Sequence, residues 1–287
     1  MYYRLLFSLL ILFIQPATAT DLYESLEPES ADSSLWLEYN IGLENSKNYY
    51  AELDLAIVAD HHLLLGGGKS DVLTLTDRVD LYTLTLGYNS PYGAPFEYGL
   101  IYDFWGNTDE LWTNTLSVPL RWNTQNWSLS LRPQFMRIFL YTQRRFNRTR
   151  RLHSSDSRAL SGEVTYYGFE RWELGVSASA YSYEADLSKL DSPIAPFLFS
   201  DITLVLSYGF PSSRLAASLA YNFDNWRLGI RQEQTISAVD DSRLDITSLS
   251  SNFYLSNDFS LLLEAGYIGI ENSQPYNYYK LGTQIFF

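Results

Sequence analysis

From residue 34 to the end of the chain, segments of about ten residues alternate between apolar and polar side chains, with turn residues between the segments. A period of two places one set of side chains on each face of a β-strand. In one such segment Phe96, Tyr98 and Leu100 share a face, and Glu97 lies on the other. This pattern predicts an all-β fold made of strands with one apolar face.

The composition favours a membrane barrel over a soluble protein. Aromatic residues make up 16% of the 287 residues and charged residues only 18%, whereas a soluble domain carries about a quarter of charged residues. The formal net charge of −13 argues against nucleic acid as a partner. The chain has no cysteine, and its residues suggest no cofactor and no metal site.

Aromatic residues often stand at both ends of an apolar face, as Trp112 and Trp122 do, and likewise Phe259 and Tyr267. Such positions are typical of the aromatic girdles of a transmembrane barrel. A soluble β-sandwich would also alternate, but its apolar face would favour valine and isoleucine. The pattern therefore predicts a transmembrane antiparallel up-and-down β-barrel.

The number of strands is expected to be even, with both chain termini on the periplasmic side. About fifteen candidate strands start near residues 34, 48, 61, 79, 96, 111, 127, 158, 172, 201, 214, 226, 244, 259 and 277. The weakest is 61–68, which contains three consecutive glycines. Leaving it out gives about 14 strands, with 12 or 16 as alternatives. Short turns such as 123–126 are expected in the periplasm, and longer loops at 142–156, 184–196, 235–243 and 271–276 outside the cell.

The N-terminal segment has the pattern of a secretory signal peptide. Arg4 precedes an apolar run, and Ala17-Thr18-Ala19 forms a small-x-small cleavage site. We therefore predict a signal peptide at 1–19. Residues 20–33 are rich in acidic residues and serine and are predicted to form an acidic periplasmic segment, which leaves 34–287 for the barrel.

The last residues form an alternating strand that ends on Phe287. The segment 280–287 resembles the β-signal of bacterial outer-membrane proteins, through Lys280, Gly282, Ile285 and Phe287. This resemblance implies recognition by the barrel-assembly machinery. Together with the signal peptide, it predicts localisation in the outer membrane of a Gram-negative bacterium.

Charged residues on the polar faces are predicted to point into the lumen. They are Glu38, Glu52, Asp54, Glu97, Asp103, Glu163, Glu173 and Glu264, opposed by Arg121, Arg132, Arg227, Arg231 and Lys280. The excess of acids would favour cations or polar neutral solutes if water fills the path. Alternatively, these charges pair and fill the interior. No predicted loop is long enough for a large plug, which favours the open lumen.

One predicted outer loop is strongly basic. Its arginines are Arg144, Arg145, Arg148, Arg150 and Arg151. Because guanidinium groups pair with phosphate, a contact with lipopolysaccharide is one hypothesis. A loop folded into the barrel mouth and a solvated loop are the alternatives.

Beside this loop, His153 and Ser155 resemble the His-x-Ser motif of outer-membrane phospholipase A. The resemblance implies His153 as base and Ser155 as nucleophile. The residues that follow, Asp156-Ser157, depart from the family's Asn-Gly, and Tyr167 stands at the spacing of its third catalytic residue, an asparagine.

The sequence thus predicts a small porin-like channel for small polar or cationic solutes. A barrel without transport, either structural or a solitary autotransporter-like barrel, is the first alternative. An outer-membrane enzyme acting on lipids is the second. The predicted partners are membrane lipid, lipopolysaccharide and the barrel-assembly machinery, and the oligomeric state stays open.

Overall fold

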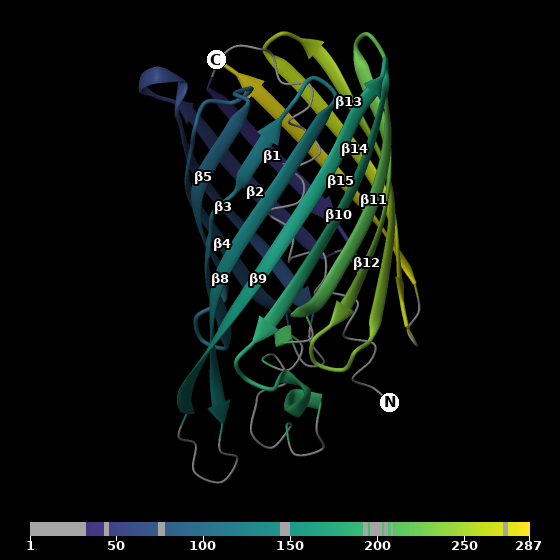
Figure 1. Cartoon of the computed structure of the whole chain (residues 1–287). Helices are drawn as coiled ribbons and strands as arrows, with labels where there is room; N and C mark the ends of the chain where they lie inside the picture. Colours follow the sequence, from purple (N-terminus) through teal and green to yellow (C-terminus); the bar gives the residue numbers. More distant parts are fainter. Residues whose placement is uncertain are drawn as a thin grey trace.

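The computed structural model describes residues 33–42, 46–73, 78–143, 150–191, 195, 203, 206–207, 209–271 and 275–287. The strands form one tall barrel in which every strand is tilted (Figure 1). Each neighbouring pair is antiparallel, and the pairing runs around a closed circle. Among the described residues, no helix combines the length and the apolar character needed to cross a bilayer.

The barrel is built from strands of very different length. They are β1 (Ser34–Ile41), β2 (Lys47–Ala56), β3 (His62–Leu73), β4 (Arg78–Asn89), β5 (Phe96–Asn107), β6 (Leu111–Ser117), β7 (Leu120–Asn123), β8 (Trp127–Gln143), β9 (Arg150–Phe169), β10 (Trp172–Tyr183), β11 (Pro211–Asn222), β12 (Trp226–Ser237), β13 (Arg243–Ser256), β14 (Phe259–Ile270) and β15 (Tyr276–Phe286). Two short 3₁₀ helices, η6 (Val58–Asp60) and η7 (Leu187–Asp191), lie in connections.

Two of the fifteen strands, β6 and β7, are the two halves of a single interrupted strand. Both β6 and β7 pair with β5 on one side and with β8 on the other. The break falls at Val118-Pro119, where proline has no N–H to donate to a ladder. The barrel therefore has 14 strand positions, as predicted.

The barrel closes where β15 meets β1, with Phe286 opposite Ser34 and Tyr279 opposite Ile41. We call the end that carries Ser34 and Phe286 the terminal end, and the opposite end the loop end. Turns such as 124–126 and 223–225 lie at the terminal end, and the connections 184–210 and 238–242 lie at the loop end.

Although the predicted number of strands is confirmed, the wrong candidate was excluded. The segment that begins near residue 61 is the full-length strand β3, which pairs with β2 and β4. Its glycines leave room for Tyr50, whose ring lies against Gly66 and Gly68. Glycine is therefore favourable at these positions of β3, because a larger side chain would collide with Tyr50.

The candidate strand that begins near residue 201 is wrong. Thr203, Leu206 and Ser207 are helical, and each is almost fully buried. The predicted outer loop 142–156 is also too long, because β8 continues to Gln143 and β9 begins at Arg150. The β8–β9 hairpin is therefore longer than the sequence pattern indicated.

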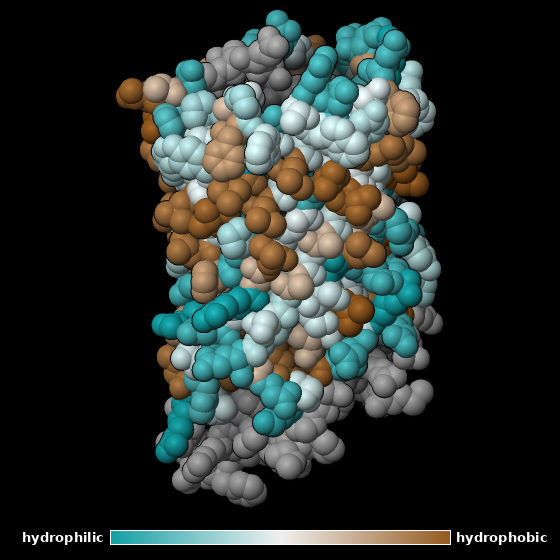
Figure 2. Space-filling model, in the orientation of Figure 1, coloured by the Kyte–Doolittle hydropathy of each residue, from teal (hydrophilic) through white to brown (hydrophobic). Residues whose placement is uncertain are grey.

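The outward face of the barrel is apolar. Large exposed side chains alternate along the strands, as Leu63 and Leu65 do on β3 and Leu129 and Leu131 on β8. Figure 2 shows apolar residues gathered in a belt across the visible face, with polar residues above and below it. Such a belt is what a lipid-facing barrel surface presents.

A row of packed aromatic rings lies at the terminal end of the barrel. Ring centroids are 4.8 Å apart for Trp172 and Tyr221 and 3.9 Å apart for Phe223 and Trp226. Trp226 in turn lies 6.0 Å from Phe253. This row matches the aromatic girdle predicted for a membrane interface.

Candidate functional site

The predicted lumen residues lie on the strand faces opposite the exposed apolar side chains. Seven of them form ion pairs with acidic or basic side chains on the same inner surface. The ion pairs among these residues join Glu38 to Lys280 at 3.5 Å, Glu97 to Arg121 at 3.5 Å and Glu173 to Arg227 at 2.7 Å, while Arg231 pairs with Glu233 at 3.1 Å. Much of the inner charge is therefore neutralised in pairs.

Carboxylates gather on one side of the barrel, over β2, β4 and β5. Tyr50 donates a hydrogen bond to Glu52 at 2.6 Å, and Thr85 donates one to Asp103 at 2.8 Å. Tyr50 also lies 3.3 Å from the Thr85 hydroxyl, which links the two contacts. On β14, Glu264 accepts a hydrogen bond from Tyr278.

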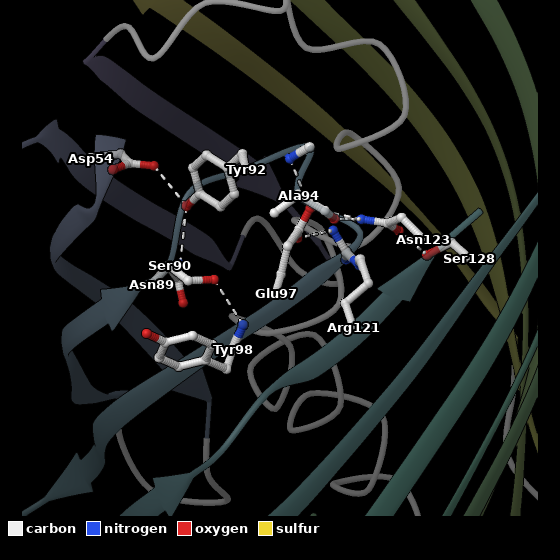
Figure 3. A network of polar contacts seen from close by, with 11 residues as sticks. Asp54, Asn89, Ser90, Tyr92, Ala94, Glu97, Tyr98, Arg121, Asn123 and Ser128 are labelled. Carbon is white, nitrogen blue, oxygen red and sulfur yellow. Dashed lines mark hydrogen bonds and ion pairs between the residues drawn. The ribbon is translucent and has the colours of Figure 1, made fainter. Parts of the chain in front are cut away.

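Hydrogen bonds hold the turn between β4 and β5 in place at the terminal end (Figure 3). Tyr92 donates a hydrogen bond to Asp54 at 2.9 Å, and the backbone N–H of Gly93 donates one to Glu97 at 2.8 Å. Asn123 donates to the same Glu97 carboxylate at 2.7 Å. The turn is therefore held to β2 on one side and to β7 on the other.

A cavity of about 170 Å³ lies inside the wall formed by β5 to β12. Six charged side chains line it, namely Asp103, Glu163, Glu233, Arg132, Arg214 and Arg231. Small residues line the same wall, namely Ser130, Ser161, Gly162, Ser177, Ser179 and Ala216. The small side chains leave the space unfilled, and the charges make it polar.

Two of these charged residues were missing from the predicted lumen set. Glu233 shares a face with the predicted Arg231, and Arg214 is adjacent to the outward-facing Leu215. Extending the alternation of β11 and β12 to the ends of both strands would have found them.

The described residues of the connection between β10 and β11 include an apolar group buried at the loop end. Leu187, Leu190, Ala195, Leu206 and Phe210 are each at most 7% exposed. They form one apolar cluster with wall residues of four other strands and one turn, namely Leu81, Trp105, Leu111, Ile138 and Val239. We call the five residues of the connection, Leu187, Leu190, Ala195, Leu206 and Phe210, the loop plug.

The prediction was that no loop is long enough for a large plug, and the loop plug adds that one connection places apolar side chains against the inner wall. That expectation divided 184–210 into a loop and a strand, whereas the structure has no strand between Tyr183 and Pro211 among its described residues. The cluster includes Leu81 of β4, and β4 lies far around the barrel from β10 and β11, which the connection joins. One connection therefore reaches across the interior.

The basic loop is only partly described. Arg144, Arg145 and Arg148 lie outside the described residues, and Arg150 is the first residue of β9. Arg151 is exposed. A contact with lipopolysaccharide stays a prediction.

His153 and Ser155 of the phospholipase-like motif lie two residues apart on β9 and bond to different groups. The His153 ring lies 3.1 Å from the Thr142 hydroxyl. The Ser155 hydroxyl accepts a hydrogen bond from the backbone N–H of Ala185 at 3.1 Å. In the described part of the chain, no group of three or more His, Cys, Asp and Glu residues could hold a metal ion.

The four residues of the predicted β-signal lie on or just after β15, the strand that closes the barrel. Lys280 points inward to Glu38, and Gly282 lies under the ring of Trp36. Beyond the strand, the Phe287 N–H donates a hydrogen bond to the Ser33 carbonyl at 2.9 Å. Recognition by the assembly machinery remains a prediction.

No protein-family model matches the chain, and no curated protein matches it in sequence. Solved structures do match. A bacterial polysaccharide outer membrane secretin has a TM-score of 0.54 at 7% identity, covering 89% of this chain and 98% of that one. A loop-deletion mutant of OmpT, an outer membrane protein of Vibrio cholerae, has a TM-score of 0.48 at 11% identity, with coverages of 89% and 98%. The NanC porin has a TM-score of 0.47 at 8% identity, with coverages of 88% and 98%.

The match at a TM-score of 0.54 agrees with the architecture seen here, since it extends over nearly the whole of both chains. The closed sheet satisfies the backbone groups of every strand, and the outward belt is apolar, as a bilayer requires. The chain is therefore a fourteen-stranded β-barrel protein of the Gram-negative outer membrane.

Proposed function

We propose that the protein is a narrow, porin-like channel for small polar solutes, with a preference for cations among the ions that it conducts. The observation that carries the proposal is the polar cavity inside the barrel. A barrel interior that only stabilised the fold could be filled with apolar side chains, since buried ion pairs add little net stability. Here small residues such as Ser161 and Ser177 leave space beside charged ones.

The cation preference follows from the sum of the inner charges. The predicted set has eight acids and five bases, and Glu233 and Arg214 raise these numbers to nine and six. The acidic excess is therefore three, and two of the acids, Glu52 and Asp103, belong to one hydrogen-bonded cluster with Tyr50 and Thr85. Carboxylates along a water-filled path favour cations.

The loop plug supports a narrow path rather than a wide one. Leu206 and Phe210 lie in one apolar cluster with Leu81 of β4 and Trp105 of β5, so solutes would pass beside this cluster. Barrels of about eight strands have filled interiors, and those of sixteen or more hold a channel. A fourteen-stranded barrel with one inserted loop fits a small conductance.

Planar-bilayer recording of the full mature protein in potassium chloride tests the proposal. We expect discrete conductance steps and a reversal potential, under a salt gradient, that shows K⁺ passing more readily than Cl⁻. Silence from a correctly folded barrel would reject the channel and support a barrel without transport. Hydrolysis of a phospholipid that is lost on Ser155→Ala would instead support the lipid-acting enzyme.

A further inference from the structure

Two hydrogen-bond donors in the cavity wall have no acceptor. The Nε atom of Arg214 and the Nε1 atom of Trp105 are both buried and unpaired among the described residues. Both residues line the cavity, and Trp105 is 9% exposed. A buried donor without an acceptor is unfavourable, so such groups commonly bind a ligand or an ordered water.

The Arg214 guanidinium makes no hydrogen bond within the described residues. It lies 5.8 Å from the centre of the Tyr181 ring, and Tyr181 also lines the cavity. The neighbouring Arg231, by contrast, is 3.1 Å from the Glu233 carboxylate. Arg214 is therefore a cation near Glu233 whose guanidinium forms no hydrogen bond within the described residues, and its planar fork suits a carboxylate.

The rest of the lining limits the ligand to a single negative charge. Asp103, Glu163 and Glu233 line the same cavity and would repel a group with two negative charges. A monocarboxylate thus fits better than a phosphate. The three acids and three bases of the lining already balance each other, so a ligand with one negative charge disturbs this balance less than a ligand with two.

Hydroxyl groups cover the wall around Arg214. The Ser179 hydroxyl donates to that of Ser161 at 2.8 Å, and Thr113, Thr115, Ser130 and Ser177 line the cavity beside them. Hydroxyls both donate and accept, so they suit a ligand that carries hydroxyl groups. A cavity of roughly 150 Å³ holds a molecule the size of benzene, and this one is about 170 Å³.

We propose that the cavity is a binding site for a small hydroxylated monocarboxylate, with Arg214 on the carboxylate and Trp105 donating to an oxygen of the ligand. The proposal deepens the channel function and rests on it only for the ligand's route through the membrane. It adds one local site for an anionic group to a lumen that is acidic as a whole.

Saturation-transfer NMR on the full mature protein in detergent tests the site directly. The probes are glycerate and its neutral counterpart glycerol. We expect glycerate to receive saturation with a dissociation constant in the millimolar range and glycerol to bind roughly tenfold more weakly. Equal binding of the two probes would overturn the proposal.

Variants locate the binding. Arg214→Gln should weaken glycerate binding roughly tenfold, and Trp105→Phe, which keeps a ring but removes the donor, should weaken it about fivefold. Arg171→Gln is the matched control, because Arg171 is half exposed and pairs with Asp224 in a turn. Unchanged binding in both cavity variants would overturn the assignment, as would stronger binding of glycerol 3-phosphate than of glycerate.

The two proposals can fail separately. Binding of glycerate by a barrel that is silent in bilayers would reject the channel and keep the site. Conductance by a barrel that does not bind glycerate would keep the channel and reject the site. If Arg214→Gln does not fold, as seen from its mobility on unheated gels, Trp105→Phe alone decides the question.

Discussion

The ring of Tyr50 lies against the backbone of Gly66 on the inner wall of the barrel. The next glycine, Gly67, faces outward, and a methyl group there would meet nothing closer than 3.8 Å. We therefore expect Gly66→Ala to destabilise the barrel by about 1–3 kcal/mol through overpacking. Gly67→Ala is the matched control and should change the unfolding free energy far less. Urea unfolding in lipid vesicles measures both, and equal effects would contradict the packing argument.

Glu173 and Arg227 form a buried ion pair of 2.7 Å, with both side chains at most 7% exposed. Removing one partner leaves a charge without compensation, so Arg227→Met should cost about 3–5 kcal/mol of unfolding free energy. The exposed pair of Arg171 and Asp224 provides the comparison, and Arg171→Met should cost at most about 1 kcal/mol. The double variant Glu173→Gln with Arg227→Met should recover part of the loss. A similar cost for both arginines would show that burial of the pair is unimportant.

Leu206 is 1% exposed within the loop plug. Leu206→Ser removes apolar contacts and should loosen the plug, so the mean conductance or the open time should rise at least twofold over the unaltered channel. Lys189→Ala serves as control, because its side chain is 80% exposed in η7. Bilayer recordings in which both variants match the parent protein would show that the plug does not limit conduction.

Glu52 lies in the acidic cluster with Asp103. Neutralising it by Glu52→Gln should lower the permeability ratio of K⁺ to Cl⁻, because one fixed negative charge leaves the path. Asp80→Asn is the control, since Asp80 pairs with the half-exposed Lys69 at 2.8 Å. The reversal potential under a salt gradient reports the ratio. An unchanged ratio for Glu52→Gln would place this residue outside the conduction path.

Phe287 follows the closing strand β15 and is 65% exposed. If the terminal aromatic serves assembly rather than stability, Phe287→Ala should reduce the amount of folded barrel in the outer membrane several-fold in cells. The same variant, refolded in detergent, should unfold at nearly the same denaturant concentration, because an exposed ring contributes little burial. A matching loss of stability in vitro would assign Phe287 a structural role instead.

The alternation of side chains was enough to predict the barrel and the inward direction of Glu173 and Arg227, whereas the number of 14 strands also needed the rule that such barrels have an even number. Period two is a local property of an extended chain, so it can be read without knowing which strands are neighbours. The girdle residues Trp172 and Trp226 were predictable for the same reason, since each stands at the end of an apolar face.

Only the tertiary structure decided which segments form the wall and what fills it. The glycines of β3 look unfavourable for a strand until Tyr50 of the neighbouring strand is seen to occupy the space above Gly66. Leu206 has the sequence surroundings of a strand, yet it is buried in one cluster with Leu81 and other wall residues that are distant in the chain. Its conformation follows from these long-range contacts, which no local pattern encodes. The cavity beside Arg214 exists for the same reason, because it is the space that the plug and the wall leave between them.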